Sequence, residues 1–438
     1  MSLDKEVELA PGFLIPRITS GLWQIADMER GGATLDKKKT AEFMEAYVNE
    51  GFYAFDMADH YGSSEIIAGV FKNDFAAGEN TRLFTKWVPA PGKITESQVE
   101  EAVSSALDRM QISSIDLMQY HAWQYAESSW IDGLMYMDEL RNDGLIQHLG
   151  VTNFDHAHLR IALTSGIPII SNQISYSLLD QRADGKMTNL CKEFGVKILA
   201  FGTLAGGFLS DRWLGQKEPM TDQLHTWSQM KYKRFIDEVG GWDVFQNLLK
   251  AIREVANKHK VSIANIATRY VLENETVASV IIGARLGKNN HIQENKKILE
   301  INLDRNDLQY LKNAQSKLQP IHGNCGDEYR KEPFLTASGD LSHHLDQFPS
   351  IFKPKKDVKG NLQVFSGTTW EELASYCRAT KSGNRIHVSG TTATHGHLSI
   401  GGSDPSAQTH FIIDKIEAAI LSLGGRLEDV VRTRIFVK

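Results

Sequence analysis

Four ionisable side chains in the first third of the chain have types and spacing that suit proton transfer. Asp56 and Tyr61 share the stretch FYAFDMADHY, Lys86 lies in RLFTKW, and His121 ends IDLMQYH. The phenol of Tyr61 has a usual pKa of about 10, and a nearby ammonium group favours its ionised form. We expect Lys86 to supply that ammonium, Asp56 to keep Lys86 charged, and His121 to orient a carbonyl oxygen toward Tyr61. The set suits protonation of a carbonyl oxygen while a hydride adds to carbon, and it lacks the nucleophile and base of an acyl-enzyme mechanism.

Three apolar segments of strand length must position these groups. Residues 52–56, 82–87 and 115–121 each end in, or just after, one of the polar side chains. Taken singly, Lys86 is typical of a solvated strand edge, His121 of a core histidine and Asp56 of a helix cap. The carboxyl ends of parallel strands converge on one face, where ligands bind. We therefore favour a common site over separate structural roles.

The rest of the chain repeats the alternation of strand and helix. A helix is predicted at 38–50, ending before Gly51, and the long stretch at 206–241 is expected to carry binding function. Eight βα units predict an α/β protein with a (β/α)8 TIM barrel. An open doubly wound sheet is the competing fold, but the chain has no GxGxxG fingerprint. The predicted strands are 18–25, 52–56, 82–87, 115–121, 146–152, 169–173, 196–201 and 279–282.

Composition limits the class of protein. The chain has 438 residues, 42% of them hydrophobic, and a formal net charge of −6. It contains no long basic block and no apolar run long enough to span a membrane, so neither nucleic acid nor membrane is an expected partner. Cys191, Cys325 and Cys377 are isolated, which predicts neither disulfides nor a metal site. We predict a cytoplasmic protein.

The motifs resemble the aldo-keto reductase family over about residues 13–318. FDMADHYGSSE is similar to the family's second strand, FTKW to its lysine strand and DLMQYHAW to its histidine strand. The resemblance implies a catalytic tetrad of Asp56, Tyr61, Lys86 and His121. It also implies that the enzyme reduces small aldehydes or ketones and that its cofactor is NADPH.

Further motifs of the same resemblance imply the cofactor contacts. GLWQIA, GVTNF, SNQISYSLLD and AFGTLAGGFL are similar to segments that bind the nicotinamide half, with Phe201 where a stacking Tyr is common. IIGARLGKNNHIQEN is similar to the adenosine-phosphate site, although a basic loop capping a helix is the alternative. Arg285 favours NADPH because its planar fork suits phosphate. The implied cofactor residues are Gly21, Leu22, Trp23, Asp56, Thr152, Asn153, Gln173, Phe201, Gly202, Leu204, Gly283, Arg285, His291, Glu294 and Asn295.

The pattern changes after Leu318. We predict a barrel at 1–318, a linker at 319–364 and a second, partial α+β unit at 365–438. NRIHVSGTTA, a helix at 406–423 and the strand DVVRTRIFVK resemble the first half of the RidA/YjgF family of enamine and imine deaminases. The later strands of that family would follow Lys438, so no deaminase residue is carried over. We expect a truncated product or a module completed by another chain, and a homo-oligomer through this unit is one expectation.

Three functions remain open from the sequence. The first is NADPH-dependent reduction of a small carbonyl substrate; the second is a regulatory or scaffold protein that binds NADPH without turnover. The third is a bifunctional remnant, in which a deaminase module once supplied a carbonyl to the barrel. The complete tetrad favours the first. Trp23, Trp87, Trp123 and Tyr125 are candidates for an aromatic substrate pocket or for the core.

Overall fold

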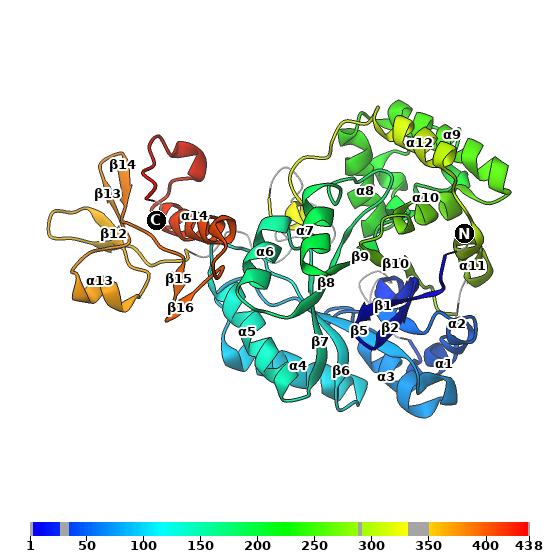
Figure 1. Cartoon of the computed structure of the whole chain (residues 1–438), viewed down its shortest axis with the longest axis horizontal. Coiled ribbons are helices and arrows are strands. Elements are labelled where there is room, and N and C mark those ends of the chain that lie inside the picture. The colour runs from blue at the N-terminus through cyan, green and yellow to red at the C-terminus, as the bar shows by residue number, and fades with distance from the viewer. Residues whose placement is uncertain (1–2, 27–34, 288–290, 332–349, 437–438) are drawn as a thin grey trace.

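Eight parallel strands close into a barrel surrounded by helices (Figure 1). The structure, a computed structural model, describes residues 3–26, 35–287, 291–331 and 350–436. The strands pair in the order β10-β3-β4-β5-β6-β7-β8-β9, which confirms the predicted (β/α)8 fold. Their bounds are β3 Ile18–Gly21, β4 Ala54–Asp56, β5 Arg82–Trp87, β6 Ile115–Tyr120, β7 Ile146–Thr152, β8 Ile169–Ser175, β9 Lys197–Phe201 and β10 Val277–Gly283.

Burial on both faces explains why these segments form a parallel barrel. Every residue of β6 is buried, and β5 is buried except for its first residue. Strands covered on both faces read as continuous apolar runs, not as alternating ones. The predicted bounds 82–87 and 146–152 are those observed.

Helices cover the outer surface of the barrel. The predicted helix at 38–50 is divided into α1 and α2, although Phe43 and Met44 between them keep helical backbone angles. Asp155 caps α6 by accepting hydrogen bonds from the backbone N–H groups of Ala157 and His158. The helices of the barrel unit are α1 Lys37–Glu42, α2 Glu45–Asn49, α3 Ser64–Asp74, α4 Glu96–Met110, α5 Ser129–Asn142, α6 His156–Thr164, α7 Lys186–Phe194, α8 Trp227–Glu238, α9 Trp242–His259, α10 Ile263–Leu272, α11 Ile292–Glu300 and α12 Arg305–Gln315.

An antiparallel hairpin that the sequence analysis missed closes the amino-terminal end of the barrel. It consists of β1 (Glu6–Ala10) and β2 (Phe13–Pro16). Phe13 and Ile15 are buried and pack with the barrel residues Phe84, Leu117 and Leu199. The opposite, carboxyl-terminal end is therefore the face left for chemistry.

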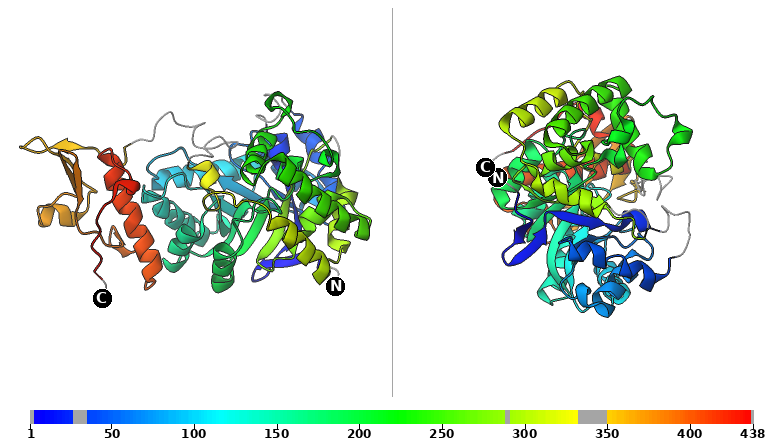
Figure 2. Two further views of the ribbon diagram at one scale, coloured as in Figure 1. Left: turned by 90° about the horizontal axis from the view of Figure 1, so that it is seen from above. Right: turned by 90° about the vertical axis from the view of Figure 1, so that its right-hand side faces the viewer.

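A smaller C-terminal unit lies at one end of the molecule, with α14 (Pro405–Ser422) between its sheet and the barrel (Figures 1 and 2). Its sheet has the order β11-β12-β13-β14. A separate β15–β16 hairpin lies close to α14. The remaining bounds are β11 Lys355–Lys356, β12 Leu362–Val364, α13 Thr369–Leu373, β13 Ala379–Ser382, β14 Arg385–Val388, β15 Thr394–His395 and β16 Leu398–Ser399.

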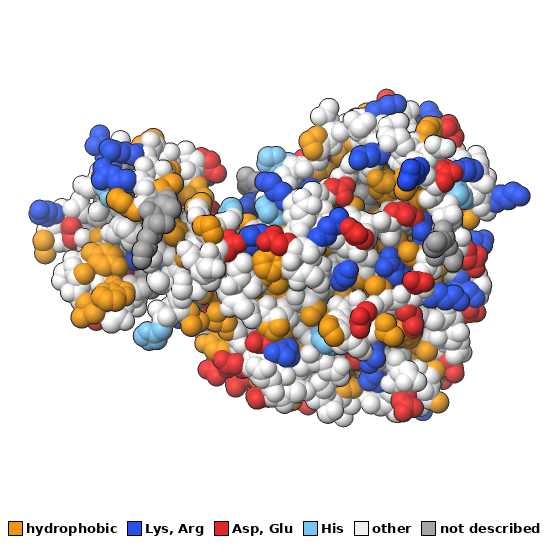
Figure 3. Space-filling view, in the orientation of Figure 1, with side chains coloured by type: hydrophobic (Ala, Val, Ile, Leu, Met, Phe, Trp, Pro, Cys, Tyr) orange, Lys and Arg blue, Asp and Glu red, His pale blue; other side chains and the backbone are white. Residues whose placement is uncertain are grey.

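The last strand expected in this unit does not form. Residues 430–436 are in no strand, and Val431, Ile435 and Phe436 are exposed. The β-branched and aromatic residues of DVVRTRIFVK suit a strand. A strand needs a neighbour to receive its hydrogen bonds, and no strand pairs with this stretch among the described residues. Figure 3 shows hydrophobic side chains gathered on the C-terminal unit, which exposes Trp370 and Leu373.

Residues 321–331 are packed on the barrel. Ile321, Cys325, Glu328 and Arg330 are buried in this segment, which we call the strap. The predicted linker therefore begins with an ordered, buried stretch, and part of its remainder, 332–349, lies outside the described residues. No helix of the described part of the chain is long and apolar enough to cross a membrane.

Candidate active site

Three neighbouring strands bring the predicted tetrad to the carboxyl-terminal end of the barrel. Asp56 is the last residue of β4, Lys86 is near the end of β5, and His121 directly follows β6. The register holds these ends level, because the backbone N–H of His121 donates to the carbonyl oxygen of Trp87. Lys86 Nζ donates to Asp56 Oδ2 at 2.6 Å and to the carbonyl oxygen of Met57 at 2.7 Å.

Tyr61 reaches the same face from the loop after β4. The Lys86 ammonium nitrogen lies 5.3 Å from the centroid of the Tyr61 ring. Burial raises the pKa of Tyr61 well above its usual value, and the Asp56 carboxylate adds to that rise. This direction is opposite to the expected lowering by Lys86, because loss of solvent outweighs the attraction of an ammonium group that Asp56 already neutralises. Tyr61 is thus a protonated phenol at neutral pH, which is the state a proton donor needs.

Burial also acts on Lys86. It lowers the pKa of the Lys86 ammonium, and the Asp56 carboxylate raises it again only in part. Both side chains are 5% exposed, so the pair is held almost entirely away from water. The expectation that Asp56 supports the charge of Lys86 agrees with this geometry.

Two side-chain amides hold Asp56 from the barrel interior. Gln173 Nε2 donates to Asp56 Oδ1 at 2.7 Å, and Gln119 Nε2 donates to the same oxygen at 3.1 Å. Gln119 was missed from the sequence, because nothing in DLMQYH indicates that its side chain turns toward Asp56. Gln173, which is also expected to contact the nicotinamide carboxamide, donates to the Asp56 carboxylate.

Aromatic rings surround the two outer members of the tetrad. The His121 imidazole lies edge-on to Trp123, with ring centroids 4.4 Å apart, and the Tyr61 ring lies edge-on to Trp23 at 4.9 Å. Trp87 packs against Tyr120, and Tyr125 packs against His158. Trp87 and Tyr125 both belong to the hydrophobic core. Of the four aromatic candidates, Trp23 and Trp123 therefore lie at the site.

The residues expected near a nicotinamide carboxamide include an unsatisfied acceptor. Thr152 ends β7, and its hydroxyl donates to the carbonyl oxygen of Gln173 at 3.1 Å. Asn153 has a φ of 60° and is buried. Its Oδ1 atom receives no hydrogen bond from any residue that the structure describes. A buried acceptor of this kind suits an external amide N–H donor.

Glycines give the backbone a close approach at the ends of β3 and β10. Gly21 pairs with Gly283, and a Cβ at Gly21 would lie 2.9 Å from the side chain of Ile281. A Cβ at Gly283 would lie 2.9 Å from the side chain of Gln24. Leu22, which follows Gly21, is buried. Glycine at these two positions therefore lets the ends of β3 and β10 pack closely against Ile281 and Gln24.

The predicted phosphate-binding residues lie at the rim above β10. Arg285 is exposed, and its Nε donates to Gln24 Oε1 at 3.2 Å. His291 precedes α11 and is exposed, and its carbonyl oxygen accepts from the backbone N–H of Asn295. Glu294, in the first turn of α11, accepts from Lys297 Nζ at 2.6 Å. Residues 288–290 between these two groups lie outside the described residues.

The long stretch after β9 forms α8, which closes over the end of that strand. Gly202 has a φ of 72°, and a Cβ there would lie 2.0 Å from the Tyr232 hydroxyl. Lys231 Nζ lies 5.0 Å from the centroid of the Phe201 ring, the position predicted to stack on nicotinamide. Leu204 is half-buried beside the second core cluster. Lys231 was not singled out from the sequence, since nothing in its segment fixes which residues turn inward.

The strap adds a further aromatic side chain beside His121. The Tyr329 ring lies 6.0 Å from the His121 ring, and its hydroxyl accepts from Lys231 Nζ at 2.7 Å. Glu328 is fully buried and accepts from Arg182 at 2.8 Å. Burial raises the pKa of Glu328, but the Arg182 guanidinium and the Lys231 ammonium outweigh it and lower the pKa to about 2. A charged network therefore ties α8 and the strap together above the tetrad.

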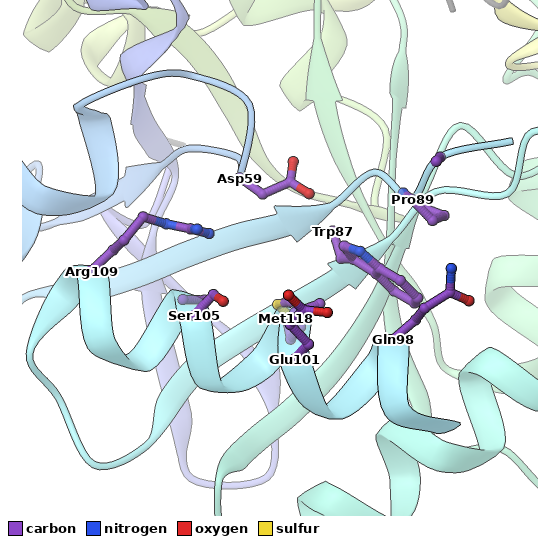
Figure 4. Close-up of a pocket in the computed structure, with 11 residues that line it drawn as sticks. Asp59, Trp87, Pro89, Gln98, Glu101, Ser105, Arg109 and Met118 are labelled. Atoms are coloured by element: carbon purple, nitrogen blue, oxygen red, sulfur yellow. The ribbon is translucent and has the colours of Figure 1, made fainter. Parts of the chain in front are cut away.

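A pocket of about 220 Å³ lies beside this site on the outer side of β5 and β6 (Figure 4). Asp59, Trp87 and Met118 line it together with residues of α4 such as Glu101 and Arg109. Asp59 belongs to the loop between Asp56 and Tyr61, so the pocket adjoins the tetrad but does not contain it. Within the described ranges, no group of three His, Cys, Asp or Glu side chains is arranged to hold a metal ion.

Comparison with known protein families identifies both parts of the chain. Residues 17–316, more than half of the chain, match the model of the Aldo/keto reductase family. The chain belongs to the aldo/keto reductase family. Residues 368–438 match a second model, Endoribonuclease L-PSP, which confirms a RidA-like C-terminal unit.

Individual proteins resemble the chain at low sequence identity. The chloroplastic pyridoxal reductase of Arabidopsis thaliana is 24% identical over 254 residues, which cover 53% of this chain and 66% of the plant protein. Flagellar radial spoke protein 5 of Chlamydomonas reinhardtii is 27% identical over 177 residues, 36% of this chain and 33% of that protein. The chain thus spans less than two thirds of either relative. An aldo-keto reductase from Klebsiella pneumoniae, solved with NADPH, has a TM-score of 0.54 at 18% identity and covers 73% of this chain and 100% of its own, a likeness of fold.

Proposed function

We propose that this chain reduces small aldehydes or ketones to alcohols with NADPH, and that Tyr61 donates the proton. The observation that carries the proposal is the buried pair of Lys86 and Asp56, 2.6 Å apart, beside the Tyr61 ring. A phenol, an ammonium group and a carboxylate from two neighbouring strands have no common structural need to share a dry site. Such groups are suited to general acid catalysis.

Each member of the tetrad has a role that follows from its surroundings. Tyr61 is protonated at neutral pH because burial raises its pKa, so it holds the proton that the carbonyl oxygen takes. Lys86, 5.3 Å from the ring centroid, stabilises the phenolate that this transfer leaves behind. Asp56 keeps Lys86 in place, and His121 orients the carbonyl oxygen. A bound NADPH supplies the hydride that adds to the carbonyl carbon.

The residues present fit the cofactor. Asn153 Oδ1 is a buried acceptor without a partner among the described residues, and it suits the carboxamide of nicotinamide. Gly21 and Gly283 pair at the ends of β3 and β10 and present no side chain at the end of the barrel where the cofactor is expected. The exposed Arg285 guanidinium suits a phosphate group. NADPH bound to the related Klebsiella pneumoniae enzyme supports the same choice of cofactor here.

One experiment tests the proposal directly. NADPH oxidation is measured at 340 nm, the absorbance of the reduced cofactor, against a panel of aldehydes, ketones and quinones. Tyr61→Phe removes one hydroxyl, so turnover is expected to fall at least about a hundredfold while the NADPH dissociation constant stays within about twofold. Tyr53→Phe is the matched control, because its hydroxyl only binds Glu6 on the surface. Unchanged turnover in Tyr61→Phe, or equal loss of turnover and binding, contradicts the assignment.

A second function, NADPH binding without turnover, is favoured by one observation. Tyr329 and Lys231 lie against His121 and Phe201, where substrate and nicotinamide are expected. The same panel separates the two functions. Tight NADPH binding with no oxidation of NADPH by any carbonyl compound identifies a binding protein.

A further inference from the structure

The C-terminal unit touches the barrel through a buried histidine. His158, on α6, uses both ring nitrogens: Nδ1 lies 2.7 Å from Asp155 Oδ2, and Nε2 lies 3.2 Å from Asp414 Oδ2. Asp155 belongs to the barrel, whereas Asp414 belongs to α14 of the C-terminal unit. Both nitrogens face carboxylates, so the ring acts as a doubly donating imidazolium. The two units are therefore joined by a charge-assisted contact that water hardly reaches, since His158 is 9% exposed and Asp414 is 6% exposed.

The same histidine is stacked on an aromatic ring that leads toward the active site. The His158 and Tyr125 rings are parallel within 5°, with centroids 3.4 Å apart. The Arg330 guanidinium carbon lies 4.7 Å from the Tyr125 centroid. Since the imidazole covers one face of the Tyr125 ring, the guanidinium lies over the other. We call Asp414, His158, Tyr125 and Arg330 the interdomain stack.

Arg330 depends on this stack more than on hydrogen bonds. Its Nε donates to the carbonyl oxygen of Ala122 at 2.7 Å, but its two terminal nitrogens receive no hydrogen-bond partner from the described residues, and the side chain is 5% exposed. A buried guanidinium needs compensation, and the Tyr125 ring supplies part of it as a cation–π contact. Disturbing Tyr125 or His158 therefore disturbs Arg330.

Arg330 in turn fixes the strap against the catalytic face. Ala122, its acceptor, directly follows His121, and Tyr329, its neighbour in the chain, lies 6.0 Å from the His121 ring. The strap is equally close to the predicted nicotinamide site, because a Cβ at Gly326 would lie 2.0 Å from the carbonyl oxygen of Asn153. Small shifts of the strap thus reach both sides of the reaction centre.

We propose that the C-terminal unit sets the catalytic geometry of the barrel through the interdomain stack. Asp414 holds His158 and Tyr125, these hold Arg330, and Arg330 holds the strap that carries Tyr329 beside His121. Asp414 and Arg330 are positioning residues, and neither is expected to touch the substrate. The inference rests on the proposed carbonyl reduction and assigns the RidA-like unit a part in it.

Other contacts between the units supply the control. His395 of the C-terminal unit binds Asp132 of α5 at 2.8 Å, and Gly401 donates its backbone N–H to Ser165 Oγ at 2.9 Å. No contact of Asp132 or Ser165 that the structure gives leads to Tyr125 or Arg330. Asp132→Asn therefore weakens the docking of the two units without touching the interdomain stack, whereas Asp414→Asn disturbs both.

The test is a double-mutant cycle in the full-length chain. Asp414→Asn and Arg330→Met are each expected to lower kcat about tenfold, within the usual range of coupling between sites, with the KM for NADPH changed less than about twofold. The double variant should be no slower than the slower single variant, because both changes break the same path. Asp132→Asn should keep kcat within about twofold of the unchanged chain. The proposal is overturned if the double variant loses kcat by the product of the two single losses, or if Asp132→Asn loses as much kcat as Asp414→Asn.

Hydrogen exchange of the strap gives a reading that needs no turnover. Backbone amides of residues 326–331 are expected to exchange about tenfold faster in Asp414→Asn, but not in Asp132→Asn. If the unchanged chain oxidises NADPH with no carbonyl compound, the proposed function fails, while faster exchange confined to Asp414→Asn still supports the path from α14 to the strap. Unchanged strap exchange in Asp414→Asn overturns the inference whether or not the chain is active.

Discussion

Replacing Lys86 by Met tests how much the buried ion pair with Asp56 contributes to the free energy of unfolding. Met has nearly the length of Lys but no charge, so the change leaves the Asp56 carboxylate buried without its counter-ion. Removing one member of a buried ion pair costs about 3–5 kcal/mol. Asp56 retains the amide donors of Gln119 and Gln173, so we expect the lower end, about 3 kcal/mol. Asp56→Asn should cost a similar amount, because it leaves the ammonium group buried.

The double variant makes this reasoning falsifiable. With both charges removed no unpaired ion remains, so Lys86→Met with Asp56→Asn should cost no more than either single variant, about 3 kcal/mol, rather than the sum of about 6. Urea unfolding followed by tryptophan fluorescence measures the change, since seven of the eight tryptophans precede residue 243. With a slope of about 3 kcal/mol per molar urea, the midpoint shifts by about 1 M. Additive losses would refute the pair as a unit.

A surface pair provides the matched control. Lys192 Nζ lies 2.5 Å from Glu275 Oε1, but the two side chains are 53% and 74% exposed. Exposed pairs contribute little, because solvent screens them. Lys192→Met should therefore leave the urea midpoint unchanged and should not affect NADPH oxidation, whereas Lys86→Met and Asp56→Asn should both abolish it.

Three further predictions address the cofactor, the strap and the interdomain contact. Arg285→Ala should raise the NADPH dissociation constant at least about tenfold but that of NADH less than about twofold, and an equal effect in equilibrium titrations would remove Arg285 from the phosphate site. Gly326→Ala should lower the unfolding free energy by about 1–3 kcal/mol more than Gly360→Ala. Both glycines have a φ of 84°, but a Cβ at Gly326 would meet Asn153 O, whereas a Cβ at Gly360 would meet no other atom. Urea titration of both variants measures the difference. Burial lowers the pKa of His158, but Asp155 and Asp414 outweigh it and raise the pKa from 6.5 to about 9. Because the pKa is higher in the folded chain, protonated His158 stabilises the fold by about 3 kcal/mol. This stabilisation is complete below pH 6.5 and is lost as pH rises through about 9. Unfolding free energies measured from pH 6 to 10 should show that decline in the unchanged chain and a flatter profile in His158→Gln.

Local sequence patterns were enough to predict the strands of the barrel. Runs such as RLFTKW and IDLMQYH contain adjacent apolar residues because parallel strands are buried on both faces, and the polar residues at their ends mark the face where a site is expected. The tetrad was predictable for that reason: once the strands are parallel, Asp56, Lys86 and His121 must reach the same end. The β1–β2 hairpin was missed because two short strands give a weak signal next to eight longer ones.

Only the tertiary structure decided what surrounds the tetrad and what reaches it from a distance. The interior position of Gln119, the approach of Lys231 to Phe201 and the strap that carries Tyr329 depend on how loops fold back over the barrel, and no periodicity in those segments fixes their direction. The raised pKa of Tyr61 likewise follows from burial, which the sequence did not specify and which outweighs the expected lowering by Lys86. The sequence indicated which side chains reach the same end of the barrel because strand period is local, whereas the contact of Asp414 with His158 joins residues 256 positions apart and exists only in the folded chain.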